Sequence, residues 1–374
     1  MLRMTTTTRL ACERLVQQME MHLARPLQPE VRQAFLSVPR HLFVEGYYQQ
    51  QGNRRKWAYI AAPTREEIYQ DEPLVTKIDK RGYPLCSSSL PGVMAQQLEA
   101  LQLHDHQRVL EIGTGTGYNA ALMSELVKPS GQIVSLDIDE SLVASASLHF
   151  SSANTLNVIA CQGNGTEGEC TFAPYDRLLA TCGVKSLPRP WIEQLKEEGL
   201  LIANVLLNLA SIFVQLRKIG PAQLEGQLLA IDAVYMEMRG PEGITPFTAM
   251  DWAPYDALPR HEVKIAGSLT TLLQETAFAV LLQCQLPTLE KHLRWNYEKQ
   301  MPDTYLLDQA SKTAVRVEDT TLICYGQQAL AQLLEQSILL YGQLGHPGLE
   351  HYLIQMNGEQ AFLRINDYSC QFPL

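Results

Sequence analysis

Apolar positions in the first two thirds of the chain follow two alternating periodicities. Continuous apolar runs typical of buried strands occupy residues 108–112, 133–137, 157–162, 175–182 and 199–206. Between them, apolar residues recur every three or four positions at 117–127, 140–153 and 188–196. This alternation predicts a parallel sheet covered by helices on both faces, and the runs at 211–218 and 225–233 are expected to close it with antiparallel strands.

The residues before this alternating region predict helices and a long loop. Helical spacing is present at 9–24 and 28–37, within a helical N-terminal part at 9–37, and it returns at 90–103. Residues 45–88 are polar, with interspersed basic and aromatic side chains. We therefore predict a long functional loop over the site there, rather than packed core.

The sequence Gly240-Pro-Glu-Gly243 marks a boundary. Beyond it the alternation stops, and the pattern predicts short strands and a helix, at 277–284, 305–307, 313–317, 321–325 and then 327–344. A final hairpin is expected to turn on Asn357-Gly358, a pair that favours tight turns. We predict an α/β domain at 1–240 and a smaller α+β domain at 241–374 that serves substrate recognition.

Composition narrows the class of protein. The 374 residues carry a net charge of −10, which argues against non-specific binding of nucleic acid. The longest apolar stretch, 200–214, is interrupted by Asn204 and Asn208, so we expect no membrane span. The eight cysteines include no Cys-x-x-Cys pair, so we expect reduced thiols in a cytoplasmic protein and no metal site.

The run VLEIGTGTGYNAA at 109–121 carries the strongest chemical signal. An apolar strand ends in glycines at 113, 115 and 117, and a helical run begins at once. A strand, a tight glycine turn and a helix N-terminus together form a site for a nucleotide-like ligand. The spacing is Gly-x-Gly-x-Gly behind Glu111, not the Gly-x-Gly-x-x-Gly of dinucleotide folds, and it points to S-adenosylmethionine (SAM) as cofactor.

Asp137 tests this interpretation. It ends the next apolar run and stands 24 residues after Gly113. Nucleoside-binding α/β units place a carboxylate about 20 residues beyond the glycines, where it accepts hydrogen bonds from ribose hydroxyls. The alternative is a surface aspartate at a strand end, which the glycine turn at the right distance makes the weaker interpretation.

Several segments together resemble the protein-L-isoaspartate O-methyltransferase family. In chain order the matching segments are VPRHLFV at 38–44, SLP at 89–91, the glycine run at 109–121, Asp137, GNG at 163–165, APYD at 173–176 and LPRPWIEQLKEEG at 187–199. They cover roughly residues 28–206. The resemblance implies a SAM-dependent methyltransferase of Rossmann-like α/β fold, with N-terminal helices and the smaller C-terminal domain as an addition.

The resemblance also implies residue roles. Ser89 would lie where SAM and the substrate carboxylate meet, and we assign it the catalytic role. The residues assigned to the cofactor are Glu111, Gly113, Gly115, Gly117, Asp137, Ile138, Asn164 and Gly165. Gly113 and Gly115 would line the methionine part, and Asn164 stands where the family has Asp beside the adenine. The residues assigned more weakly to the substrate are Lys77, Lys80, Arg81, Ser88 and Thr181.

The implied chemistry needs little from the protein. A carboxylate is ionised and nucleophilic at neutral pH, so positioning and desolvation, rather than a general base, must supply the rate. Ser89 would orient the carboxylate by a hydrogen bond. The structural alternative is a helix N-cap ahead of Leu90-Pro91.

Two departures from the family pattern favour a peptide substrate. The segment before Ser89 carries basic residues, namely Arg54, Arg55, Lys56, Lys77, Lys80 and Arg81. A whole domain also follows residue 240. The run MEMRG at 236–240 and the chain end from Gln327 resemble extended members associated with ribosomal peptide gene clusters, namely the lanthipeptide, graspetide and FxLD-system methyltransferases. There, methylation of an Asp side chain gives an ester that can form an aspartimide. Two alternatives for the function remain open, namely repair of isoaspartate in aged proteins and a non-catalytic SAM-binding module suggested by Asn164. The alternative for the basic residues is ordinary solvated surface charge.

Overall fold

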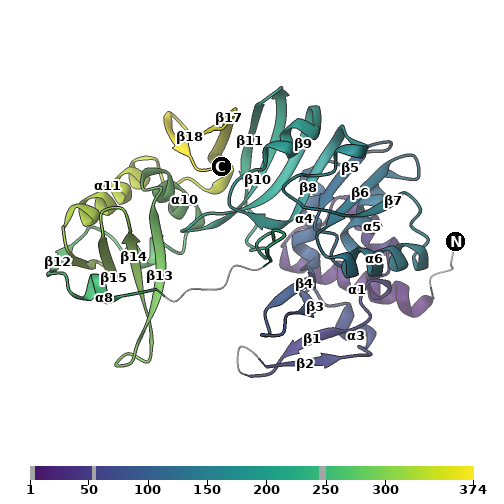
Figure 1. The fold of residues 1–374 in the computed structure, drawn as a ribbon, viewed down its shortest axis with the longest axis horizontal. Coiled ribbons are helices and arrows are strands. Elements are labelled where there is room, and N and C mark those ends of the chain that lie inside the picture. Colours follow the sequence, from purple (N-terminus) through teal and green to yellow (C-terminus); the bar gives the residue numbers. More distant parts are fainter. Residues whose placement is uncertain (1–4, 53–55, 244–249) are drawn as a thin grey trace.

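The computed structural model describes residues 5–52, 56–243 and 250–374, and its centre is a ten-stranded sheet (Figure 1). The strand order is β19-β18-β17-β11-β10-β9-β8-β5-β6-β7. The parallel strands are β5 (Arg108–Ile112), β6 (Gln132–Asp137), β7 (Val158–Gln162), β8 (Tyr175–Val184) and β9 (Leu195–Leu206). Strands β10 (Ser211–Gly220) and β11 (Gln223–Leu229) continue the sheet antiparallel, as the sequence pattern predicts.

Helices and neighbouring segments cover both faces of the parallel strands. Apart from one short helix described below, the helices of the first half are α1 (Thr6–His22), α2 (Pro29–Ser37), α4 (Pro91–Leu101), α5 (Tyr118–Val127), α6 (Glu140–Ser152) and α7 (Arg189–Gln194). Consecutive strand residues enter opposite cores: Val109 packs with α1, α2, α4 and α5, whereas Leu110 packs with α7 and later helices. Burial on both faces is why these strands read as continuous apolar runs.

The segment 45–88 is not a loop, so that prediction is wrong. It forms a four-stranded sheet of order β2-β1-β3-β4 with one short helix. The elements are β1 (Tyr47–Gln50), β2 (Trp57–Ile60), α3 (Arg65–Ile68), β3 (Leu74–Ile78) and β4 (Pro84–Ser88), after the 3-10 turn η1 (Arg40–Leu42). Its apolar core is small, with Val44, Tyr47 and Leu74 as the buried members. So little apolar surface leaves a weak strand signal in the sequence.

The second half holds a five-stranded antiparallel sheet of order β12-β16-β15-β14-β13. Its strands are β12 (Arg260–Lys264), β13 (Leu289–Asn296), β14 (Met301–Asp308), β15 (Thr313–Glu318) and β16 (Thr321–Tyr325). Its helices are α8 (Ala253–Asp256), α9 (Leu269–Leu272), α10 (Thr276–Gln285) and α11 (Ala329–Gln343). The strand predicted at 277–284 is therefore wrong, because a short, wholly buried apolar run has no periodicity that separates strand from helix.

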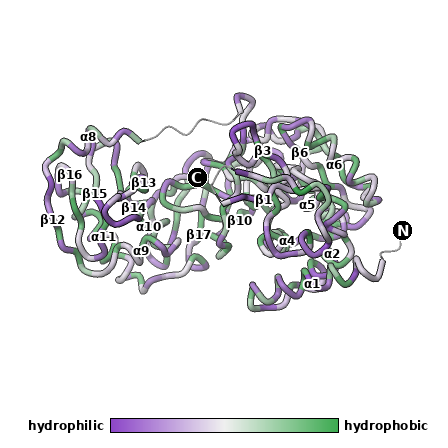
Figure 2. The backbone as a smooth tube through the Cα atoms, turned by 90° about the horizontal axis from the view of Figure 1, so that it is seen from below, coloured by the Kyte–Doolittle hydropathy of each residue, from purple (hydrophilic) through white to green (hydrophobic). Residues whose placement is uncertain are grey.

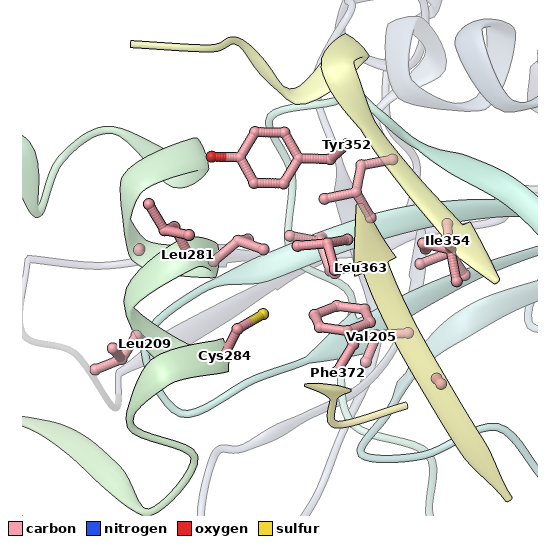
Figure 3. Close-up of a cluster of buried hydrophobic side chains, with 14 of the residues drawn as sticks. Val205, Leu209, Leu281, Cys284, Tyr352, Ile354, Leu363 and Phe372 are labelled. Carbon is pink, nitrogen blue, oxygen red and sulfur yellow. The ribbon is translucent and has the colours of Figure 1, made fainter. Parts of the chain in front are cut away.

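The last three strands join the second half to the main sheet. Strand β17 (Tyr352–Asn357) pairs with β11, and β18 (Gln360–Ile365) and β19 (Tyr368–Phe372) follow it. The hairpin turns at Asn357-Gly358 as predicted. Figure 3 shows α10 side chains, among them Leu281 and Cys284, facing this hairpin. The residues after 240 thus share a continuous apolar core with the first half.

The two halves lie side by side, and the C-terminus lies between them (Figure 2). The chain returns from the second half to the main sheet where β17 pairs with β11. The remaining short elements are the 3-10 turns η2 (Cys170–Phe172) and η3 (Leu349–His351). Within the described ranges, no helix is both long and apolar enough to cross a membrane.

Candidate active site

A cavity of about 600 Å³ lies at the carboxyl ends of β5, β6 and β8. Such a position, beyond the ends of parallel strands, is where open α/β sheets bind their ligands. Eight of the residues assigned from the sequence line it, namely Ser88, Ser89, Gly113, Gly115, Asp137, Ile138, Gly165 and Thr181. The structure therefore brings most of the assigned cofactor residues together with Ser88, Ser89 and Thr181.

The glycine turn forms the floor of the cavity. Gly113 and Gly115 have φ of 105° and 52°, a backbone region that favours glycine. A Cβ at Gly113 would lie 2.5 Å from the hydroxyl oxygen of Thr181, and that hydroxyl donates to the Gly113 carbonyl at 2.7 Å. The turn therefore depends on glycine at 113. Thr181 lines the cavity and also holds the turn in place.

Asp137 is fixed against this turn by two backbone amides. One carboxylate oxygen accepts a hydrogen bond from the Gly115 N–H and the other from the Asp139 N–H, both at 3.0 Å. The residue is 8% exposed and lines the cavity. Each carboxylate oxygen can accept more than one hydrogen bond, so Asp137 retains capacity for the hydroxyls of a ligand.

Glu111 lies beneath the floor, outside the cavity lining. It is fully buried and accepts hydrogen bonds from Ser135 at 2.5 Å and Asn119 at 2.8 Å. Burial raises the pKa of Glu111 from 4.5 to about 7, against the opposing effect of these two donors. Its assignment as a direct cofactor ligand is not supported by this position, and Glu111 instead ties β5 to β6 and α5.

Gly117 and Asn164 also stand outside the lining. A Cβ at Gly117 would lie 2.8 Å from the ring of Phe150, so this glycine permits close packing of α5 on α6. The Asn164 side chain closes a local turn, donating to Glu167 and accepting from the Thr166 N–H, both at 3.1 Å. The adjacent Gly165 forms the cavity wall instead.

Ser89 follows directly after β4 and faces a buried tyrosine. Helix α4 begins at Pro91 with Leu90 as its N-cap and no side-chain cap, so the N-cap alternative for Ser89 is wrong. Burial raises the pKa of Tyr235, and a hydrogen bond with the Ser89 side chain opposes that shift. The Tyr235 hydroxyl also donates to Gln97. Tyr235 was missed in the sequence, because its contact with Ser89 spans more than a hundred residues.

Arg40 is a second residue that sequence reasoning did not assign. It is fully buried and donates to the Ser88 hydroxyl at 3.2 Å and to the Ser88 and Ser89 carbonyls. Burial lowers the pKa of Arg40 to about 10, so it stays charged at neutral pH. Arg40 thus fixes the backbone that presents Ser89. The VPRHLFV motif at 38–44 contains this arginine and was the available signal.

The basic residues assigned to the substrate do not line the cavity. Lys77 donates to Asp139 at 2.6 Å and to Ser141 at 2.7 Å. Arg81 lies in the β3–β4 turn, where it bonds Asp79, and Lys80 is exposed beside it. Arg54 and Arg55 lie outside the described residues, and Lys56 is exposed next to them. Only Ser88 and Thr181 of the assigned set reach the cavity.

The segment 232–239 forms the remaining wall, and the sequence pattern did not reveal this. It runs beside the end of β8, where the Gly183 N–H donates to the Met236 carbonyl and the Met238 N–H donates to the Gly183 carbonyl, both at 2.8 Å. Its residues from Asp232 to Arg239 line the cavity. The connection to the second half of the chain therefore passes along the site.

The cavity residues fit SAM as cofactor. The volume falls within the range of small-molecule sites. The turn at Gly113 and Gly115 lets the backbone approach a ligand closely, and Asp137 offers acceptors for ribose hydroxyls. At Gly165, a Cβ would lie 2.9 Å from Ile112 and 2.7 Å from the Met238 sulfur, so this wall is tight as well.

Comparison with known proteins gives one consistent family. The family model for protein-L-isoaspartate(D-aspartate) O-methyltransferase matches residues 12–236. A protein-L-isoaspartate O-methyltransferase of Fervidobacterium nodosum is 35% identical over 179 residues, which are 48% of this chain and 87% of the relative. One from Thermotoga maritima is 35% identical over 180 residues, which span 48% of this chain and only 51% of that protein.

A solved structure titled protein-L-isoaspartate O-methyltransferase covers 96% of this chain and 98% of its own, with a TM-score of 0.56 and 23% identity. At that identity the likeness concerns the fold alone. It extends through the second half of the chain, which the family model does not cover.

Proposed function

This chain belongs to the protein-L-isoaspartate(D-aspartate) O-methyltransferase family, and we propose that it methylates the carboxylate of an aspartyl or isoaspartyl residue in a peptide or protein. The family is SAM-dependent. The observation that carries the proposal is the single cavity in which the glycine turn, Asp137 and Ser89 meet.

The residues of this chain have positioning roles in the reaction. SAM supplies a methyl group activated by its sulfonium sulfur. An acceptor carboxylate is already ionised, so no residue needs to remove a proton, and the Ser89 hydroxyl donates a hydrogen bond to the oxygen that does not react. Arg40 holds the Ser89 backbone in place for this contact.

Two cysteines line the cavity and must not compete for the methyl group. Burial raises the pKa of Cys86 to about 11 and that of Cys182 to about 12. Because the thiolate is the nucleophilic form, both side chains are neutral and weakly nucleophilic near pH 7. The cavity therefore leaves an incoming carboxylate as the nucleophile.

The finer proposal is an Asp side chain in a modified peptide as acceptor. Attack of the following backbone N–H on the new ester would expel methanol and leave an aspartimide, a net loss of water from the starting peptide. Support comes from the MEMRG run at 236–240, whose resemblance to peptide-modifying members motivated the idea and which lines the cavity up to Arg239.

Repair of isoaspartate is the second candidate. The names of the similar proteins favour it. The solved structure that matches nearly the whole chain shows only that this fold, second half included, occurs in another protein. The third possibility, a module without catalysis, rested on Asn164, whose side chain is engaged in a turn outside the cavity.

Three peptides of one sequence, with Asp, isoaspartate or Asn at a single position, separate these candidates. Each is incubated with the protein and SAM and followed by mass spectrometry. A gain of one CH2 mass, or a later loss of water, in the Asp peptide supports the finer proposal. The same gain confined to the isoaspartyl peptide supports repair. SAM binding without methylation of any acceptor, modified precursor peptides included, would leave the non-catalytic module.

A further inference from the structure

We propose that Arg239 is a specificity-determining residue that binds a second carboxylate on the acceptor peptide, three or four residues from the one that is methylated. The inference rests on the proposed function. It concerns a residue outside the segment matched by the family model, which ends at residue 236.

The guanidinium of Arg239 lies at the cavity with most of its donors unused. Its side chain is 22% exposed and lines the cavity. Among the described residues its contacts are a hydrogen bond of 3.4 Å to the Leu85 carbonyl and a separation of 4.0 Å from Asp139. A guanidinium carries five N–H donors arranged to match a carboxylate, so this group has the capacity for an anionic ligand.

The Asp139 carboxylate does not neutralise Arg239. Lys77 donates to the same carboxylate oxygen at 2.6 Å, and the Ser141 hydroxyl bonds the other oxygen at 2.7 Å. Burial alone would raise the pKa of Asp139, but these hydrogen bonds outweigh it and hold the pKa below its ordinary value. Two cations thus face one carboxylate, which leaves a positive charge at this part of the rim.

Other acidic groups on the same segment do not compensate it. Glu237 pairs with Lys185 at 2.9 Å on the exposed side. Asp232 is exposed and stands at the opposite end of the segment, seven residues before Arg239. The charge of Arg239 is therefore available to a ligand.

The position of Arg239 favours the peptide over the cofactor as its partner. One oxygen of the Asp137 carboxylate accepts from the Gly115 N–H and the other accepts from the Asp139 N–H. The guanidinium of Arg239 lies 4.0 Å from the Asp139 carboxylate. The Leu85 carbonyl that Arg239 binds belongs to β4, the strand that leads to Ser89. We therefore assign Arg239 to the peptide acceptor at Ser89 rather than to the cofactor.

Strand β4 sets the distance to the methylated residue. Arg239 bonds Leu85, and Ser89 stands four residues further along, about 13 Å in extended chain. Residues 85–89 all line the cavity, so an extended peptide can lie along them. The rise per residue of an extended peptide is the same as that of β4. A carboxylate bound at Arg239 therefore belongs to a residue three or four positions from the acceptor.

The test uses the full chain and the acceptor type that it methylates. One peptide carries Asp four residues before or after the acceptor, a matched peptide carries Asn there, and a third has Asp next to the acceptor. The wild type should show kcat/KM about tenfold higher for the distant-Asp peptide than for the Asn peptide, mainly through KM. Arg239→Gln should remove this preference and leave SAM affinity unchanged, whereas Arg239→Lys should restore part of it.

Lys185→Gln is the matched control, because it removes an exposed cation beside the same segment and should keep the preference. Equal rates of the wild type on the three peptides would overturn the inference. The inference would also be overturned if the Arg239→Gln variant kept the preference, or if its SAM affinity fell by as large a factor as its KM for the peptide rose. No methylation of any peptide by the wild type would instead count against the proposed function itself.

Discussion

The floor and the rim of the cavity are built in different ways. The floor, residues 113–115 with Asp137, comes from neighbouring segments, and backbone conformation and backbone hydrogen bonds shape it. The rim, residues 85–89 with 232–239, joins distant parts of the chain through side chains such as Arg40 and Tyr235. We infer that the floor fixes the cofactor and that the rim selects the acceptor.

The largest effect is expected from a change in the floor. Gly113→Val places a branched side chain at φ 105° and against Thr181, so the turn must rearrange. SAM affinity measured by calorimetry should fall by at least about 100-fold, because a cost of a few kcal/mol corresponds to that factor. Gly345→Val is the matched control, since Gly345 has φ 81° and no neighbour within 4 Å of a Cβ. Equal losses in the two variants would mean that global strain, not the floor, is responsible.

A rim change should separate catalysis from cofactor binding. Ser89→Ala removes one hydrogen bond to the acceptor, and kcat is expected to fall by roughly 10- to 1000-fold. SAM affinity should change much less, since Ser89 contributes a side chain to the rim and not to the glycine turn. Ser147→Ala, which changes an exposed serine of α6 outside the cavity lining, serves as control. An equal loss of kcat in the control, or full activity in Ser89→Ala, would contradict the role given to Ser89.

A smaller effect, on stability, tests the support beneath the floor. The pKa of Glu111 is raised from 4.5 to about 7, so the folded protein holds this proton more tightly than the unfolded chain. Stability from this group is full below pH 4.5 and is lost as the pH rises to about 7, by about 3 kcal/mol in total. Glu111→Gln should remove that part of the pH dependence in denaturant unfolding at pH 5 and pH 8. An unchanged pH dependence would contradict the burial argument.

The residues of the floor are recognisable in the sequence because local rules specify their conformation. Glycines that need positive φ, and an aspartate at the end of the next strand, are visible without any long-range information. Glu111 and Gly117 belong to the same motif but act one layer away, and the motif alone does not tell a lining residue from a supporting one.

The rim and the second half depend on contacts between distant residues. Pairing of β11 with β17 joins Gln227 to Leu353, and no local pattern encodes it. Arg239 faces the cavity only because the segment before it runs beside Gly183. The small sheet of 45–88 was hidden for a different reason, since its strands bury little apolar surface and resemble a polar loop.

The most direct test of the account follows an isotopically labelled methyl group from SAM into an aspartyl or isoaspartyl peptide. The account predicts that the label leaves the peptide as methanol, either in mild alkali or when the ester closes to an aspartimide, since N- or S-methyl groups are released by neither route. It also predicts no label in the Asn peptide or with the Gly113→Val protein. Label that resists alkali, or equal labelling of the Asn peptide, would contradict carboxyl methylation at this site.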